Sequence, residues 1–63
     1  MTIGQHVTIH SPFYGTCPAV IVSVEPIGIH PGAYVRYIDC GSEALRAKLR
    51  GRRDWYSERN ITL

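Results

Sequence analysis

The first 35 residues contain no lysine or arginine, and their single acidic residue is Glu25. All seven basic residues lie in 36–63, where four acidic residues reduce the formal charge to +3. Five of the seven fall between 46 and 53. A concentrated cationic segment attracts polyanions and acidic protein surfaces from a distance. The charge pattern therefore indicates a binding role, but it does not specify the partner.

The chain also lacks the material and the motifs of an enzyme. Its 63 residues form a single domain, 1–63, near the lower size limit for a hydrophobic core that folds alone. A core this small contributes about 3–5 kcal/mol of net stability, and a deep catalytic cleft is hard to build around it. No nucleophile elbow, P-loop or dinucleotide-binding glycine motif is present. We therefore expect a non-catalytic binding module with no cofactor.

Long hydrophobic runs are absent as well. The longest strongly apolar stretch, 19–24, is far shorter than the roughly 20 residues that span a bilayer. The first residues show neither the cationic nor the apolar region of a signal peptide, which predicts a cytoplasmic protein without a membrane partner. In that compartment Cys17 and Cys40 are expected to be reduced.

Metal-ligand spacing is missing too. Cys17 and Cys40 have no second cysteine close by in the sequence. His6 and His10 share a strand face, but four residues separate them by roughly 13 Å, too far for both to ligate one zinc ion. A set that combines His6 and His30 with the two cysteines has no supporting spacing. The sequence predicts no metal site.

What is present is a series of β-strand patterns. Ile3, Val7 and Ile9 alternate with His6, Thr8 and His10, as in a half-buried strand, and Gln5 interrupts the apolar row near its start. Residues 19–25 are mostly β-branched, which predicts a strand in the centre of the sheet. A third strand is predicted over 33–39, and glycine and proline residues mark the turns between these segments.

The segment 43–50 supports two predictions. Its composition favours a helix, with Ser42 as the N-cap and Gly51 just past the C-terminus. Yet residues 45–49 also alternate between apolar and basic side chains, as a strand would. Local propensity favours the helix, and either structure leaves a cationic face over an apolar one.

The two ends of the chain carry a family resemblance. The opening 4–9, the turn at Gly15 and the strand 19–24 resemble the start of an SH3-like barrel of the KOW or Tudor type. The ending 55–63 is similar to the closing strand, one-turn helix and last strand of such barrels. The resemblance implies a mainly β fold, a small barrel of about five strands with one short helix or helical insertion near 43–50. It also implies a binding role, often toward RNA, DNA or protein.

The leading hypothesis is that a cationic face binds nucleic acid at its phosphates, with little sequence preference. Arginine suits this role because its planar fork makes bidentate phosphate contacts, and aromatic rings beside it can stack bases. Trp55 is expected in the core because of its size, whereas Tyr34 and Tyr56 are expected at the surface. The candidate residues are Arg46, Lys48, Arg50, Arg52 and Arg53 for phosphate, with Arg36, Tyr34 and Tyr56 for bidentate or stacking contacts.

The alternative is a protein-interaction module, either an adaptor or a small inhibitor of the accessory kind that phages and plasmids carry. Such a module would dock on an acidic protein surface, as a monomer or a small homo-oligomer. Phe13 and Tyr14, in the first predicted loop, would then form the aromatic wall of a peptide groove. A third reading, that the charge only keeps the protein soluble, also fits the composition.

Overall fold

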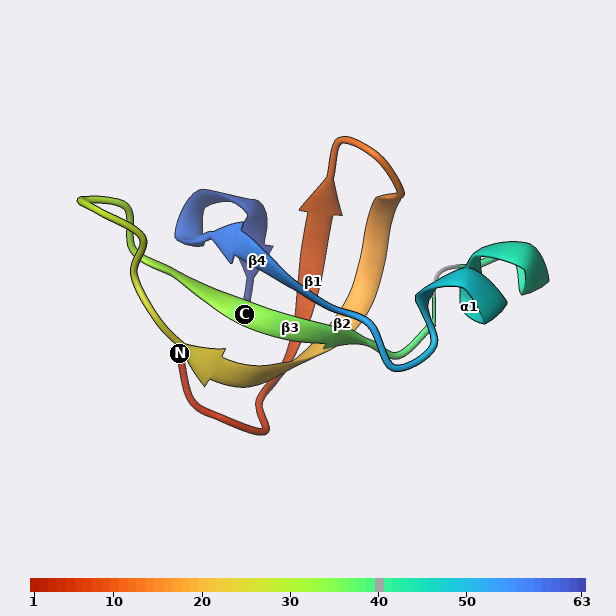
Figure 1. The fold of residues 1–63 in the computed structure, drawn as a ribbon, viewed down its shortest axis with the longest axis horizontal. Helices are drawn as coiled ribbons and strands as arrows, with labels where there is room; N and C mark the ends of the chain where they lie inside the picture. The colour runs from red at the N-terminus through yellow and green to blue at the C-terminus, as the bar shows by residue number, and fades with distance from the viewer. Residues whose placement is uncertain (40) are drawn as a thin grey trace.

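The computed structural model describes residues 1–39 and 41–63, and Cys40 lies outside the described residues. The strands form one antiparallel sheet in the order β4-β3-β2-β1-β5, which curls into a half-barrel (Figure 1). The predicted mainly β fold of about five strands with one short helix is therefore confirmed. The elements are β1 (His6–Ser11), β2 (Gly15–Val24), β3 (Gly32–Tyr37), α1 (Glu43–Leu49), β4 (Arg53–Ser57), η1 (Glu58–Asn60) and β5 (Ile61–Thr62).

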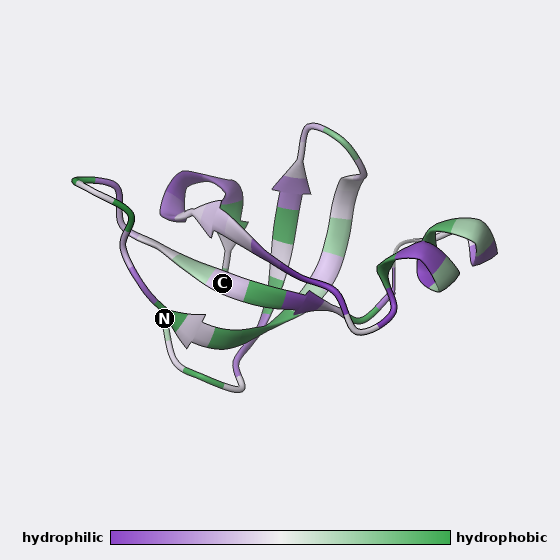
Figure 2. Cartoon of the chain, in the orientation of Figure 1, coloured by the Kyte–Doolittle hydropathy of each residue, from purple (hydrophilic) through white to green (hydrophobic). Residues whose placement is uncertain are grey.

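Strand alternation places the core on the inner face of the curled sheet. β2 pairs with both β1 and β3, which confirms the predicted central strand. Figure 2 shows hydrophobic residues alternating with hydrophilic ones along these strands, as expected for a sheet with one buried face. The core cluster consists of Val7, Ile9, Ala19, Ile21, Ala33, Val35, Tyr56 and Ile61.

The start of the first strand differs from the prediction. Ile3 lies before β1 and is 67% exposed, so it does not extend the apolar row of that strand. Gly4 has a φ of 88°, and the Gln5 N–H donates to the Thr2 carbonyl at 3.0 Å, which closes a turn. Because glycine adopts positive φ without steric cost, the chain turns here and β1 begins only at His6.

The segment 43–49 is a helix, and its capping residues explain why. The Ser42 hydroxyl accepts a hydrogen bond from the Leu45 N–H at 3.1 Å, and Gly51 has a φ of 72° just past the last turn. Leu49 is fully buried against Cys17, whose thiol is free. None of the helices in 1–39 and 41–63 has the length and apolar character needed to cross a membrane.

The end of the chain follows the prediction. β4 is followed by the one-turn helix η1, with Ser57 at its N-cap position, and then by the two-residue strand β5. The Glu58 N–H donates to the Pro31 carbonyl at 2.9 Å, which holds η1 beside the β2–β3 connection. β5 pairs with β1, so the last residues form one edge of the half-barrel and β4 forms the other.

Candidate nucleic-acid interface

The register between β3 and β4 places two arginines directly opposite each other. Arg36 pairs with Arg53, and both side chains are exposed. Directly opposed residues on antiparallel strands have Cβ atoms about 4.5–5.5 Å apart, and like charges at that spacing destabilise the sheet. Figure 2 shows this hydrophilic zone where β3 ends and β4 begins. An anion that contacts both guanidinium groups would relieve the repulsion.

The same register places two aromatic residues next to this pair. Tyr34 lies opposite Trp55, two positions along each strand from the arginines. Because side chains alternate between faces, all four lie on the side of the sheet away from the core. We call this surface the β3–β4 outer face, and it consists of Tyr34, Arg36, Arg53 and Trp55.

Trp55 is held in place on this face by its own contacts. Its Nε1–H donates to the Glu25 carbonyl at 2.7 Å. Its indole covers Gly32, where an added Cβ would lie only 2.4 Å from the nearest ring atom. Gly32 therefore leaves space for the ring, and the hydrogen bond fixes its orientation. The indole is half-buried, so part of it remains accessible.

The predicted positions of Trp55 and Tyr56 are wrong: Tyr56, predicted at the surface, is buried, and Trp55, predicted in the core, lies on the outer face. Tyr56 is only 8% exposed and belongs to the core cluster, so its ring cannot serve as a surface stacking group. Trp55 is half-buried on the outer face. The reason is the register, because Tyr56 lies opposite the buried Ala33 and Trp55 opposite the outward-facing Tyr34.

The inner face of the same two strands carries a closed polar network. The Tyr37 hydroxyl donates to Asp54 Oδ2 at 2.7 Å, and it also shares a hydrogen bond with the Tyr56 hydroxyl. Burial raises the pKa of Tyr37 well above its ordinary value, and the hydrogen bonds to Tyr56 and Asp54 raise it further. Tyr37 therefore stays neutral, and the only charged member of the network, Asp54, is paired with Arg52.

Two of the predicted phosphate contacts are paired with acids. Arg46 Nε lies 3.6 Å from Asp39 Oδ1, and Arg52 Nε lies 3.1 Å from Asp54 Oδ2. The hydrogen bond from Arg52 to Asp54 raises the pKa of Arg52, and the negative charge of Asp54 raises it further. These pairings lower the net positive field of the 46–53 segment.

Lys48 is engaged in a different way. Its Nζ lies 5.9 Å from the centre of the Tyr14 ring, within the range of a cation–π contact. The remaining predicted cations, Arg36, Arg50 and Arg53, form no ion pair within residues 1–39 and 41–63. These three have their full charge available for a ligand.

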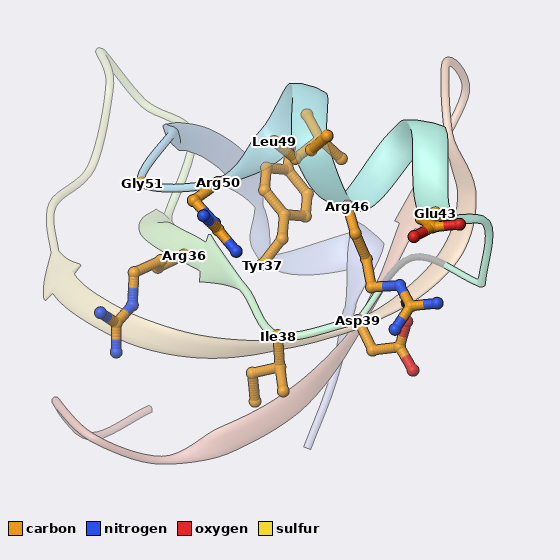
Figure 3. Close-up of a pocket in the computed structure, with 10 residues that line it drawn as sticks. Arg36, Tyr37, Ile38, Asp39, Glu43, Arg46, Leu49, Arg50 and Gly51 are labelled. Carbon is orange, nitrogen blue, oxygen red and sulfur yellow. Dashed lines mark ion pairs between the residues drawn. The ribbon is translucent and has the colours of Figure 1, made fainter.

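A groove of about 680 Å³ connects two of these free arginines. It runs between α1 and the end of β3, and Arg36 and Arg50 both line it. In Figure 3, Arg36 and Arg50 lie on one side of the Tyr37 ring, and Arg46 with Asp39 lies on the other. The groove therefore has one end with free cations and one end where Arg46 lies beside the acidic residues Asp39 and Glu43.

The residues of the alternative hypothesis, Phe13 and Tyr14, lie at the β1–β2 loop, next to Trp55. Phe13 is 84% exposed in the β1–β2 loop, and Tyr14 packs edge-on against Tyr37 with ring centres 5.9 Å apart. Both line a hollow of about 170 Å³, together with Arg52, Asp54, Trp55 and Tyr56. This hollow contains none of the three free arginines.

The structure thus brings Tyr34, Arg36 and Arg53 together and adds Arg50 at the groove. Trp55 also belongs to this surface, whereas the sequence predicts it in the core. One signal could have found it, because Trp55 is two residues from Arg53 and must share its strand face. No protein-family model matches this chain, and neither do the curated proteins or the solved structures with which it was compared.

Proposed function

We propose that this chain is a small non-catalytic module that binds nucleic acid through its phosphates. Arg36, Arg50 and Arg53 are the contacts, and the half-barrel is of the SH3-like type, as its strand, one-turn helix and last strand suggest. The observation that carries the proposal is the placement of Arg36 opposite Arg53 with no acidic partner among the described residues. Such a pair destabilises the free protein and is neutralised by a bound polyanion.

Salt dependence is the direct test. Each phosphate contact releases condensed counterions, so three contacts predict a slope of log affinity against log salt of about −2 to −3. The affinity of a fluorescently labelled mixed-sequence oligonucleotide should be measured at several salt concentrations by anisotropy. A flat response would contradict phosphate contact.

Single substitutions assign the contacts. Arg36→Gln and Arg53→Gln should each weaken binding and bring the slope about one unit closer to zero. Arg59→Gln is the matched control, because it removes the same charge from η1, outside the β3–β4 outer face. Equal losses in all three variants would mean that only net charge matters and that the assigned residues are wrong.

The exposed Phe13 supports a second candidate, a protein-docking module. A ring that is 84% exposed at the rim of an aromatic hollow is typical of peptide recognition. A partner held this way should remain bound after nuclease treatment and should be lost in Phe13→Ala. The nucleic-acid proposal predicts the opposite result, with binding that is sensitive to nuclease and independent of Phe13.

A further inference from the structure

The β3–β4 outer face offers more than positive charge. Along β3, Tyr34 and Arg36 are two residues apart, which is about 6.6 Å at the usual strand rise. Across the strands, Trp55 and Arg53 repeat the same order. Each arginine therefore has an aromatic ring beside it on the same face, which is the combination that proteins use to bind single strands.

Trp55 is also preorganised for a ligand. The Glu25 carbonyl holds its Nε1–H at 2.7 Å, and the ring rests on Gly32. A stacking platform that is already fixed loses little conformational entropy when a base packs on it. No aromatic ring of the described residues pairs with the indole, since the aromatic pairs of 1–39 and 41–63 involve only Phe13, Tyr14, Tyr37 and Tyr56.

We infer that the β3–β4 outer face binds single-stranded nucleic acid, with a base stacked on Trp55 and neighbouring phosphates on Arg36 and Arg53. This inference rests on the proposed function and specifies its ligand class. A duplex keeps its bases stacked on each other and presents mainly phosphates to such a surface, so the aromatic pair would contribute nothing to binding it. Base–aromatic stacking tolerates any sequence, because every base has a π-face.

The test uses the intrinsic fluorescence of Trp55, the only tryptophan in the chain. Three ligands of equal length are titrated: a mixed-sequence single strand, an abasic sugar–phosphate strand and a duplex. Ribose and deoxyribose forms of the single strand distinguish RNA from DNA, and preferential binding of either form supports the inference. The intact single strand should quench Trp55 and bind on the order of tenfold more tightly than the abasic strand, given one stacked base.

Substitutions separate stacking from structure. Trp55→Leu keeps an apolar side chain over Gly32 but removes the ring, and it should bring single-strand affinity down to the abasic level. Trp55→Phe keeps a ring and should retain part of the preference, which a purely structural role would not produce. Leu63→Ala is the control, because it removes an exposed apolar side chain just after β5, at the sheet edge opposite β4, and it should change nothing.

The outcomes are distinguishable. If the abasic strand or the duplex binds as tightly as the intact single strand, phosphate contact suffices and the single-strand inference is wrong, while the proposed function stands. If none of the three ligands binds at low salt, both are wrong. Because the abasic comparison uses the unmodified protein, it remains decisive even if a Trp55 variant fails to fold.

Discussion

On the inner face of β3 and β4, polar side chains bond to one another, whereas on the outer face they do not. Inside, the hydroxyls of Tyr37 and Tyr56 and the carboxylate of Asp54 form a connected hydrogen-bond network. Outside, Arg36 and Arg53 lie opposite each other without an acidic partner among the described residues. The same two strands therefore carry a surface that stabilises the fold and a surface left available for a ligand.

The difference separates polar groups that stabilise the fold from those that we propose bind a ligand. A buried polar group must find a partner within the protein, because leaving it unsatisfied costs about 1–3 kcal/mol. An exposed guanidinium is solvated by water and can remain unpaired at little cost. Like charges placed side by side reduce stability slightly, and a bound anion compensates for that. Arg46 and Arg52 are already paired with Asp39 and Asp54, so a bound anion would relieve no repulsion there.

The comparison is tested most strongly at the adjacent residues Tyr56 and Trp55. Tyr56→Ala removes a core side chain and should cost about 3–5 kcal/mol, close to the whole net stability of a domain this small. Trp55→Ala, on the outer face, should cost less and leave a folded protein. Urea denaturation followed by circular dichroism gives both values. A larger loss for Trp55→Ala would reverse the assignment of the two faces.

These two residues also show where sequence reasoning was insufficient. In β4 both side chains are large and aromatic, so the hydrophobic pattern does not say which one faces the core. The register with β3 decides, and register depends on contacts between residues distant in the sequence. The helix at 43–49 was predictable because its signals, Ser42 and Gly51, are local.

Among the charged residues, local pairings are likewise predictable and long-range ones are not. Arg52 and Asp54 are two residues apart, and their pairing is a local event that the sequence suggests. Arg46 and Asp39 are joined only because α1 folds back toward the end of β3. The sequence therefore predicted the strands, the helix and part of the cationic surface, but not which cations the fold would neutralise.

Gly32 is a position on the outer face that has no room for a side chain. An added Cβ would lie 2.4 Å from both the Trp55 ring and the Tyr56 carbonyl oxygen. Because the backbone oxygen cannot move away easily, Gly32→Ala should destabilise the protein by about 1–3 kcal/mol and change the fluorescence of Trp55. Gly28→Ala is a poor control, since Gly28 has a φ of 60° that disfavours alanine. Pro26→Ala in the same connection is better matched.

The inner network can be opened by removing one hydroxyl. Tyr37→Phe leaves Asp54 and the Tyr56 hydroxyl without this partner and should cost about 1–3 kcal/mol. The matched variant Tyr34→Phe removes a hydroxyl from the outer face and should have little effect on the urea midpoint. Equal losses at both positions would remove the distinction between the faces.

Tyr37 also makes stability depend on pH. Its pKa in the folded protein is raised above the ordinary 10.0, because burial and its hydrogen bonds favour the neutral phenol. The folded state therefore keeps a proton that the unfolded state releases, so this stabilisation is complete below about pH 10 and is lost as pH rises further. Urea midpoints measured between about pH 9 and 11.5 should fall more steeply for the wild type than for Tyr37→Phe.

The smallest change in stability is expected at the like-charge pair of Arg36 and Arg53. Arg36→Gln removes a like-charge contact and should raise stability by about 0.2–1 kcal/mol, whereas it should weaken the proposed nucleic-acid binding. The gain should be present at about 0.01 M salt and absent at about 1 M salt, where charges are screened within about 3 Å. Lost binding together with lost stability would indicate that Arg36 is a structural residue.

Because Leu49 packs on Cys17, the accessibility of the Cys17 thiol reports whether α1 is detached from the sheet. The thiol is inaccessible while α1 rests on the sheet, and its Sγ lies 3.6 Å from the Tyr14 carbonyl. In a Cys40→Ser chain, a thiol reagent can modify only Cys17, and the reaction rate then measures how often the helix lifts. A ligand that occupies the groove between α1 and β3 would slow that reaction, so chemical labelling can report occupancy without any dye.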